Sequence, residues 1–229
     1  MKNCIFAPPP QPSVPIEGCS AVFPVHRIYC VGRNYAGHAR EMGEDPLREP
    51  PFFFCKPPDA VVAVPEVVDY PPRTSQLHHE IELVVAIGKM GADIPVAEAA
   101  GHIFGYAVGV DLTRRDLQQQ AKDLRRPWDT GKGFDQSAPL SMVRPAGITP
   151  PPAHAAIWLK VNGVMRQQGN VADMIWNVSE IIAELSTLFT LLPGDLVFTG
   201  TPAGIGAIDR GDVLEGGVDG IGRLAFSMV

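Results

Sequence analysis

The segment 78–88 constrains the fold of this 229-residue chain more than any other stretch. It reads HHEIELVVAIG, and its β-branched and aliphatic residues before a closing glycine predict a β-strand. Side chains alternate between the two faces of a strand, so Ile81 and Leu83 predict a core face. Glu80 and Glu82 then point together to the opposite face, about 7 Å apart along the strand.

Two interpretations of this glutamate pair remain open at this point. Alternating glutamates are common on the solvated face of a half-buried edge strand, and the pattern alone favours that interpretation. Two neighbouring carboxylates also repel each other unless a cation lies between them. Oxygen ligands suit hard divalent cations such as magnesium, manganese or calcium, so a metal site is the second interpretation of the pair.

Composition limits the class of protein. An apolar content of 45% and a charged content of 19% are typical of one globular domain with ample core. The net charge of −6 provides no basic surface for nucleic acid. No apolar run approaches the ~18 residues of a membrane span, and the N-terminus does not resemble a signal peptide. The 23 prolines and 23 glycines predict many turns between short strands.

The four cysteines lack the spacing of a zinc site, so we expect reduced thiols in a cytoplasmic protein. They are Cys4, Cys19, Cys30 and Cys55. Residues 1–24 are rich in proline and predict an extended arm, packed on the body or partly mobile. Residues 25–229 then form the main domain, in which no internal repeat is evident.

The segment 32–43, GRNYAGHAREMG, predicts about two helical turns over residues 35–42. His38 and Glu41 lie three residues apart and therefore share a face of that helix. A histidine held by a carboxylate is suited to act as a general base. Taken alone, the pair is more typical of a surface ion pair on a short helix.

Four further positions are candidates for a site. Asp111 ends the apolar segment 103–110, where it either caps the following helix or binds a metal. Gln118 shares a face of that helix with Arg115. Lys132 lies between two glycines in the segment 126–134, which we expect to be a loop that lets it approach a ligand. Thr201 belongs to the glycine-rich turn 200–206, which presents backbone N–H groups and a hydroxyl to a carboxylate.

Five motifs in this order resemble the fumarylacetoacetate hydrolase superfamily. They are GRNYAGHAREMG (32–43), HHEIELVVAIGK (78–89), GVDLTRRDLQ (109–118), GKGFD (131–135) and PGDLVFTGTPAGIG (193–206). The chain is most similar to the short acylpyruvate hydrolases. The segments EPPFFFCKPPDAV, RPWDTGKGFD and QQGNVADMIWNV resemble bacterial fumarylpyruvate hydrolases of gentisate-type aromatic degradation.

This resemblance implies an α+β, mainly β fold: a mixed β-sandwich roll of the superfamily's C-terminal type, with a few short helices. It also implies a homodimer and a helical lid at about residues 33–48 that carries His38 and Glu41. Three carboxylates, Glu80, Glu82 and Asp111, would bind Mg²⁺ or Mn²⁺. Lys132 would be a catalytic lysine. Gln118, Thr201 and Arg33 would contact the substrate.

The implied reaction is metal-dependent hydrolysis of a carbon–carbon bond in a 2,4-diketo acid, with fumarylpyruvate giving fumarate and pyruvate. His38, oriented by Glu41, would activate the attacking water. The distal carboxylate of the fumaryl group needs a cation, for which Arg33 and Arg73 are candidates. The alternatives are another acylpyruvate hydrolase, an oxaloacetate decarboxylase, an enol–keto isomerase and a non-catalytic ligand-binding dimer.

Overall fold

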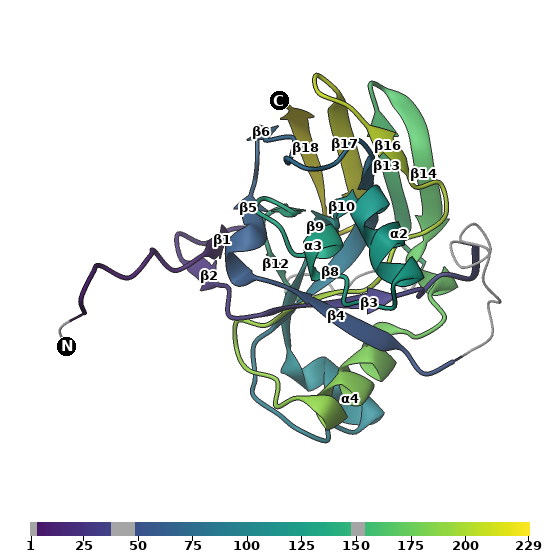
Figure 1. Cartoon of the computed structure of the whole chain (residues 1–229). Coiled ribbons are helices and arrows are strands. Elements are labelled where there is room, and N and C mark those ends of the chain that lie inside the picture. The colour runs from purple at the N-terminus through teal and green to yellow at the C-terminus, as the bar shows by residue number, and fades with distance from the viewer. Residues whose placement is uncertain (1–3, 38–48, 148–153) are drawn as a thin grey trace.

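The computed structural model describes residues 4–37, 49–147 and 154–229. Strands dominate these residues, and curled sheets stack on one another with a few short helices around them (Figure 1). The expected α+β, mainly β class is therefore confirmed. No helix in the described ranges has the length and apolar character needed to cross a bilayer.

The largest sheet among the described residues has eight strands. The candidate site residues Glu82 and Asp111 lie in, or directly after, two of these strands. Seven of them follow one another in the order β4 (Phe52–Lys56), β3 (Ile28–Gly32), β15 (Leu196–Phe198), β8 (Ile81–Ile87), β9 (Ile103–Val110), β11 (Ala138–Leu140) and β5 (Val61–Ala63). The eighth, β12 (Arg144–Pro145), also pairs with β9. The sheet is mixed, because β3 and β15 run parallel whereas β8 and β9 run antiparallel.

A second sheet of five strands lies above the first in Figure 1. Its order is β14 (Val164–Asn170), β13 (Ala156–Val161), β17 (Val213–Val218), β18 (Gly222–Met228) and β6 (Val67–Val68). A hairpin turn at Asn162-Gly163 joins β13 to β14, and both turn residues have positive φ, as a two-residue hairpin turn of type I′ requires. A small sheet links β10 (Thr113–Arg114), β7 (Leu77–His79) and β16 (Gly206–Ile208).

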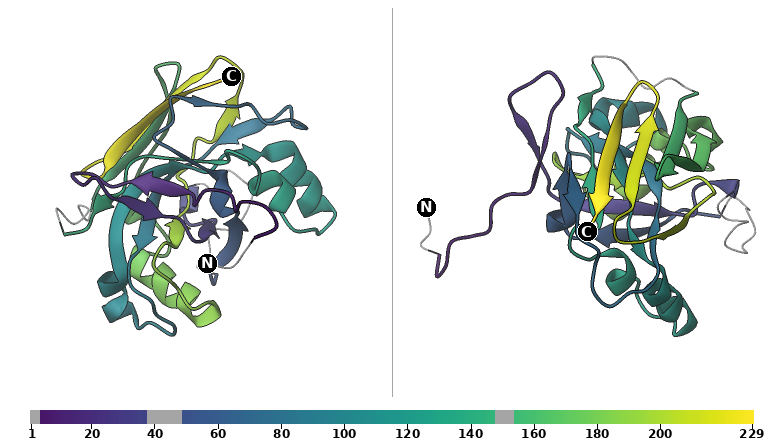
Figure 2. Two further views of the ribbon diagram at one scale, coloured as in Figure 1. Left: turned by 90° about the vertical axis from the view of Figure 1, so that its left-hand side faces the viewer. Right: turned by 90° about the horizontal axis from the view of Figure 1, so that it is seen from above.

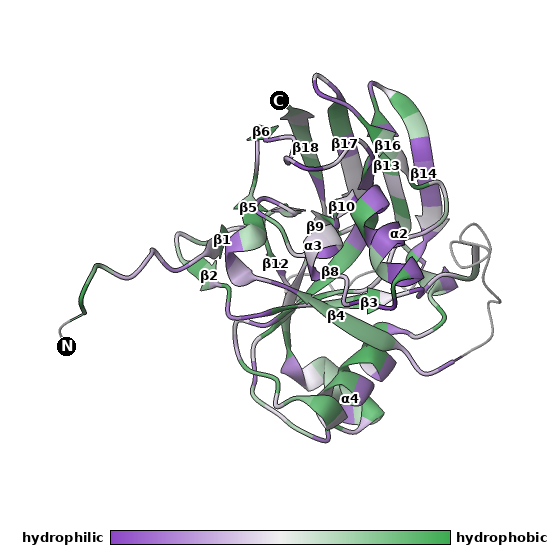
Figure 3. Ribbon diagram, viewed as in Figure 1, coloured by the Kyte–Doolittle hydropathy of each residue, from purple (hydrophilic) through white to green (hydrophobic). Residues whose placement is uncertain are grey.

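Strand β8 is buried along its whole length, because each of its faces meets a different hydrophobic cluster. Ile81 and Leu83 belong to the cluster that also contains Ile157 and Leu159 of the five-stranded sheet. Val84 belongs to the second cluster, on the other face. Figure 3 shows this buried strand as hydrophobic, whereas the outer strand β14 and helix α2 (Arg115–Asp123) carry hydrophilic stretches. Glu82 shares the face of Val84, at the start of the strand.

The helices are short, and one of them lies where the sequence predicted a loop. Helix α4 (Val178–Leu188) begins after the Asn177 cap and ends at Leu188, because Phe189 is extended. The segment 126–134 is not a simple loop, since α3 (Asp129–Lys132) forms one helical turn there. The 3-10 turns are η1 (Pro58–Ala60), η2 (Val96–His102) and η3 (Val171–Asp173).

The N-terminal segment contains a small hairpin of β1 (Ser13–Pro15) and β2 (Val22–Pro24). Val14 and Phe23 of this hairpin are buried in the cluster that includes Val84. The chain before the hairpin extends away from the body in Figures 1 and 2. The hairpin therefore shares the core of the main sheet, whereas the residues before it do not.

Candidate active site

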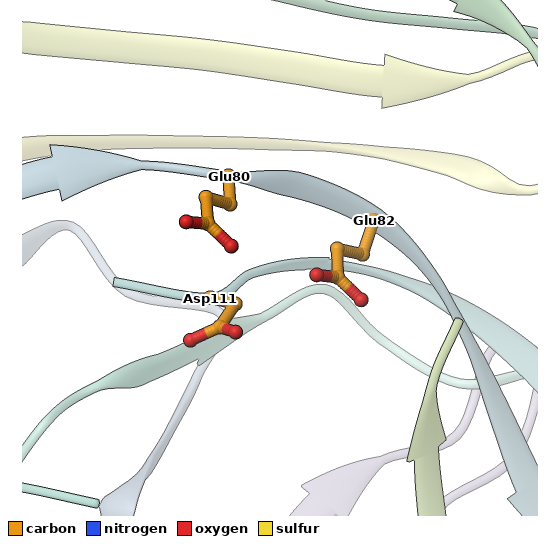
Figure 4. Close-up of side chains that lie close together, drawn as sticks. All are labelled: Glu80, Glu82 and Asp111. Carbon is orange, nitrogen blue, oxygen red and sulfur yellow. The ribbon is translucent and has the colours of Figure 1, made fainter. Parts of the chain in front are cut away.

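Three buried carboxylates converge where β8 and β9 meet. Glu80, Glu82 and Asp111 each place a carboxylate oxygen so that these atoms lie within 4.8 Å of one another. Figure 4 shows the two glutamates reaching from one strand toward the aspartate of the neighbouring strand's end. The three residues are 5%, 2% and 0% exposed.

Sheet pairing brings these residues together. Ile81 pairs with Val110, and the Asp111 N–H donates to the Glu80 carbonyl at 2.8 Å. The last residue of β9 therefore delivers Asp111 beside the first residues of β8. Glu80 and Glu82 project from the same side of their strand because side chains alternate in direction. The predicted metal ligands are thus brought together by one antiparallel pair.

Both competing interpretations of the carboxylates are wrong. The glutamates do not lie on a solvated edge strand, because β8 pairs with β15 on one side and β9 on the other. Asp111 does not cap the following helix, because α2 begins only after Arg114. Three buried carboxylates without a capping or solvent-facing role require cations beside them.

Two lysines and one arginine supply those cations from within the chain. Lys132 Nζ lies 2.8 Å from Glu80 Oε2 and 2.7 Å from Asp111 Oδ2. Lys56 Nζ lies 2.8 Å from the other aspartate oxygen, Oδ1. Arg115 forms an ion pair with Glu80 Oε1. These three basic residues pair with Glu80 and Asp111, and none of these ion pairs involves Glu82.

The backbone around Lys132 explains how a lysine reaches this buried position. Lys132 ends the short helix α3, and its ammonium also donates to Thr113 Oγ1 at 2.7 Å. Gly131 lies so close to α2 that an added Cβ would be 2.9 Å from the Gln118 backbone nitrogen. Burial by itself lowers the pKa of Lys132, but Asp111 and Glu80 outweigh it and hold that pKa above its ordinary value. The ammonium is therefore charged.

Glu82 is the carboxylate for which the chain provides the least positive charge. Burial, followed by Asp111 and Glu80, raises the pKa of Glu82 well above its ordinary range. Its Oε2 accepts a hydrogen bond of 2.7 Å from the Gly200 N–H. Gly200 has a φ of +98°, and a Cβ there would lie 2.7 Å from the Asn34 Cβ, so a side chain is disfavoured. The glycine-rich turn thus contacts a protein carboxylate.

Thr201 connects this turn to strand β8. Its hydroxyl donates to the Ile81 carbonyl at 2.8 Å and accepts from Gln167 Nε2 at 2.7 Å. Gln167 Oε1 in turn lies 2.8 Å from His79 Nδ1 and accepts from the Ile81 N–H at 3.1 Å. This buried network holds β8 on both sides of Glu80.

A cavity opens beside the carboxylates and contains most of the other predicted site residues. It is lined by Arg33, Gln118, Lys132 and Thr201, by Arg115 and Lys122, by the apolar residues Val31, Phe52, Phe54 and Trp128, and by Gly32 and the three carboxylates. Gln118 is buried, and its Oε1 accepts a hydrogen bond from Arg115 Nη1. The structure therefore brings Gln118 and Arg33 to the carboxylates.

Arg73 lies elsewhere. It lines a separate cavity, together with Arg114 and Leu117, on another side of α2. The sequence alone gives no means of separating Arg73 from Arg33, because the side of α2 on which each lies depends on packing. His38 and Glu41, with most of the predicted lid 33–48, lie outside the described residues.

Two buried site residues were not predicted. Lys56 was visible only as a lysine that ends an apolar strand, a position that is usually solvated. Gln167 lies in β14, on a strand whose other residues are largely exposed, so its pattern marks no site. Both become evident only when distant strands are placed beside β8.

The donor set fits a hard divalent cation. All three groups are carboxylates, which are the ligands that Mg²⁺ and Mn²⁺ prefer, and their oxygens are already close together. Burial and the neighbouring Asp111 and Glu80 raise the pKa of Glu82, so a cation bound there would favour its ionised form. These observations indicate a metal centre.

Comparison with known proteins supports the same interpretation. The fumarylacetoacetate (FAA) hydrolase C-terminal family model matches residues 27–229. A crystal structure of fumarylpyruvate hydrolase from Pseudomonas aeruginosa, in complex with Mn²⁺ and pyruvate, superposes with a TM-score of 0.97. It is 54% identical, and the match covers 99% of each chain.

Two relatives of known name differ in activity. Fumarylpyruvate hydrolase of Ralstonia sp. is 48% identical over 181 residues, which is 79% of this chain and 93% of the relative. The mitochondrial oxaloacetate tautomerase of Mus musculus is 42% identical over 201 residues, which is 88% of this chain and 90% of the relative. The similarity therefore identifies the family, whereas the choice between these two reactions depends on the geometry of the site.

Proposed function

Because this chain belongs to the fumarylacetoacetate hydrolase family and is a hydrolase of carbon–carbon bonds in ketonic compounds, we propose that its substrate is an acylpyruvate, fumarylpyruvate in particular. The products are then fumarate and pyruvate. The observation that carries the proposal is the buried triad of Glu80, Glu82 and Asp111 beside a cavity that also presents Lys132 and Gln118. The resemblance to a fumarylpyruvate hydrolase that binds Mn²⁺ and pyruvate supports it.

The three carboxylates would hold Mg²⁺ or Mn²⁺. When bound, such an ion supplies Lewis-acid polarisation of the 2-keto group and stabilises the negative charge of the departing pyruvate enolate. Arg115 keeps Glu80 oriented through their ion pair. Lys56 does the same for Asp111 from the other side of the cluster.

The remaining steps belong to side chains of the chain itself. His38, oriented by Glu41, removes a proton from the water that attacks the C4 carbonyl carbon. Gln118 donates a hydrogen bond to the oxygen that becomes negative. Lys132 does the same by exchanging one of its three acceptors, on Glu80, Asp111 or Thr113, for that oxygen. Each donor contributes about 3 kcal/mol. The C3–C4 bond then breaks, its electron pair passes to the pyruvate fragment, and C3 takes up a proton. The roles of His38 and Glu41 rest on their motif.

Oxaloacetate tautomerisation is the second candidate, because the mouse tautomerase is 42% identical to this chain. That reaction moves a proton between C3 and the 2-keto oxygen. It uses the same carboxylate triad and needs no attacking water. The aromatic residues of the cavity, Phe52, Phe54 and Trp128, favour the hydrolase, because oxaloacetate has no acyl group that could pack against them.

The test compares three activities of one enzyme preparation with Mn²⁺: hydrolysis of fumarylpyruvate, hydrolysis of acetylpyruvate and tautomerisation of oxaloacetate. We expect the highest kcat/KM for fumarylpyruvate. His38→Ala should lower kcat/KM for hydrolysis by about 100-fold or more, the usual contribution of a general base. A preference for oxaloacetate, or full hydrolysis by His38→Ala, would reject the proposal. The homodimer and the cytoplasmic location remain predictions of the sequence.

A further inference from the structure

The spacing of the two carboxylates on β8 depends on the residue between them, Ile81. Glu80 and Glu82 leave the strand on one side, and the Ile81 side chain leaves it on the other. That side chain lies in the core cluster shared with the five-stranded sheet. A Cβ added at Gly216 of β17 would lie 2.6 Å from Ile81 Cδ1, so the two strands are in direct contact there. Any rotation of the Ile81 backbone would therefore move both carboxylates.

The backbone of Ile81 lies just beyond the end of the neighbouring strand, β15. This strand ends at Phe198, which pairs with Val84. The same register would place Thr201 opposite Ile81. Gly200, with a φ of +98°, turns the chain out of the strand before that point. The strand therefore ends before its backbone can pair with Ile81.

Two side chains bond to Ile81 in place of a strand. The Thr201 hydroxyl donates to the Ile81 carbonyl at 2.8 Å, and the Ile81 N–H donates to Gln167 Oε1 at 3.1 Å. Gln167 comes from β14, in the other sheet, and is completely buried. A buried N–H that loses its acceptor is unfavourable. The loss of Gln167 would thus be felt at the residue between the two glutamates.

The Gln167 amide uses its full capacity of two accepted and two donated hydrogen bonds. Its Oε1 also lies 2.8 Å from His79 Nδ1, and its Nε2 donates to the Thr201 hydroxyl at 2.7 Å and to the Pro202 carbonyl at 2.8 Å. The Ile81 N–H can only donate and the Pro202 carbonyl can only accept, so the amide has a single orientation. One amide therefore joins β7, β8 and the glycine-rich turn.

Close backbone contacts fix the position of Gln167 itself. The glycine-rich turn lies directly on β14, because a Cβ added at Gly204 would overlap the Arg166 carbonyl oxygen. A Cβ added at Gly169 would lie 2.8 Å from the Pro202 Cβ. Glycine at both positions allows this approach. The amide is thus held on a rigid support, which is what the precise geometry of a metal site requires.

We propose that Gln167 is a positioning residue of the metal centre: by fixing the backbone of Ile81, it holds Glu80 and Glu82 at the separation that one divalent cation requires. This inference rests on the metal-binding role of the carboxylates in the proposed function and adds to it a residue of the second sheet. Gln167 is not among the described residues that line the cavity beside the carboxylates, so it acts through β8. Its loss should weaken binding of the ion itself.

Gln167→Met tests this role, because methionine has a similar length and no amide. Calorimetric titration of the metal-stripped protein with Mn²⁺ should give a Kd about 10- to 100-fold higher than that of the wild type, the usual effect of removing a group that orients metal ligands. Ser186→Ala is the matched control. The Ser186 hydroxyl, on helix α4, accepts the buried Ile94 N–H at 2.8 Å. Both variants should unfold at lower urea concentration than the wild type, but Ser186→Ala should keep the wild-type Kd for Mn²⁺.

Thr201→Val provides a second route to the same quantity, because it removes the other side-chain partner of the Ile81 backbone and leaves Gln167 in place. Its Kd for Mn²⁺ should rise by about 10-fold. In the double variant the increase should be smaller than the product of the two single effects, because both act through one residue.

A wild-type Kd in either folded single variant would overturn the assignment, as would an equal rise of Kd in Ser186→Ala. If the wild type binds no Mn²⁺, the metal role in the proposed function fails. If the wild type binds Mn²⁺ and the variants bind it equally well, only the positioning role of Gln167 fails.

Discussion

Lys56 Nζ lies 2.8 Å from Asp111 Oδ1, and both side chains are buried. The ammonium also donates to the carbonyl oxygens of Leu112, at 3.2 Å, and of Lys132. Lys56 thus joins a metal-ligand candidate to the backbone of Lys132. Strand β4, the segment directly after β9 and helix α3 are distant in sequence, and they meet at this one ammonium group.

Replacing Lys56 tests whether this contact holds the site together. In Lys56→Met the Asp111 carboxylate loses one of its buried cations, and breaking such a pair costs about 3–5 kcal/mol. Urea unfolding in EDTA should show this loss of free energy of unfolding. Lys89→Met is the control, because Lys89 is exposed and its loss should change stability by less than about 0.5 kcal/mol. Equal stability of Lys56→Met and wild type would contradict the role.

Glu82→Gln should have opposite effects with and without metal. Burial and the neighbouring Asp111 and Glu80 raise the pKa of Glu82, so its ionised form is unfavourable in the folded protein. In EDTA the neutral glutamine should therefore make the protein more stable. With Mn²⁺ the order should reverse, because a ligand is lost and affinity falls by about 100-fold.

Calorimetric Mn²⁺ titration and thermal unfolding measure the two effects of this substitution. Glu98→Gln, on the exposed surface of η2, provides the control with the same change of charge. Unchanged Mn²⁺ affinity in Glu82→Gln would show that Glu82 is not a ligand.

Thr201→Val removes the hydroxyl that joins the glycine-rich turn to β8. The Ile81 carbonyl and the Gln167 amide each lose a buried partner, which costs about 1–3 kcal/mol. Thr201→Ser keeps the hydroxyl and should lie within about 1 kcal/mol of wild type. Chemical unfolding of the three proteins distinguishes these cases. A valine variant as stable as the serine variant would mean that the hydroxyl network adds nothing to stability.

The buried position of His78 leads us to expect a loss of stability in acid. Burial, assisted by the charge of Arg115, lowers its pKa from 6.5 to about 4. The unfolded chain therefore takes up a proton near pH 6.5, whereas the folded chain does so only near pH 4. Between these values the unfolded state binds more protons, so this contribution to stability falls as the pH falls.

The measurement compares the free energy of unfolding of wild type and His78→Asn from pH 7 to pH 4 in EDTA. Other groups titrate in this range, so the informative quantity is the difference between the two curves. Wild type should lose more stability than the variant over the window. Parallel curves would show that His78 titrates normally in the folded state.

Strand alternation predicts that Glu80 and Glu82 point to the same face, and Asp111 ends a later strand that pairs with theirs. That pattern alone favours a solvated edge strand for the glutamates, and it is the family resemblance that groups the three carboxylates as metal ligands. The hairpin at Asn162-Gly163 is local, since two residues with positive φ specify the turn. Periodicity and turn chemistry place such residues, but they do not assign a metal to them.

The rest of the site depends on packing between distant segments. Lys56 looks like a solvated strand end until β4 is placed beside helix α3, which carries Lys132. Gln167 lies on a mostly exposed strand, and its contact with His79 crosses between two sheets. Arg33 and Arg73 have the same chemistry and positive φ, and only the orientation of α2 places them in different cavities.

Metal dependence is tested by measuring the products that metal-stripped enzyme forms from fumarylpyruvate before and after Mn²⁺ is added. We predict no carbon–carbon cleavage in EDTA, and equal amounts of fumarate and pyruvate once Mn²⁺ saturates the protein. Undiminished release of both products in EDTA would contradict a metal centre at Glu80, Glu82 and Asp111. An Mn²⁺-loaded enzyme that leaves the carbon–carbon bond intact would contradict the proposed hydrolysis.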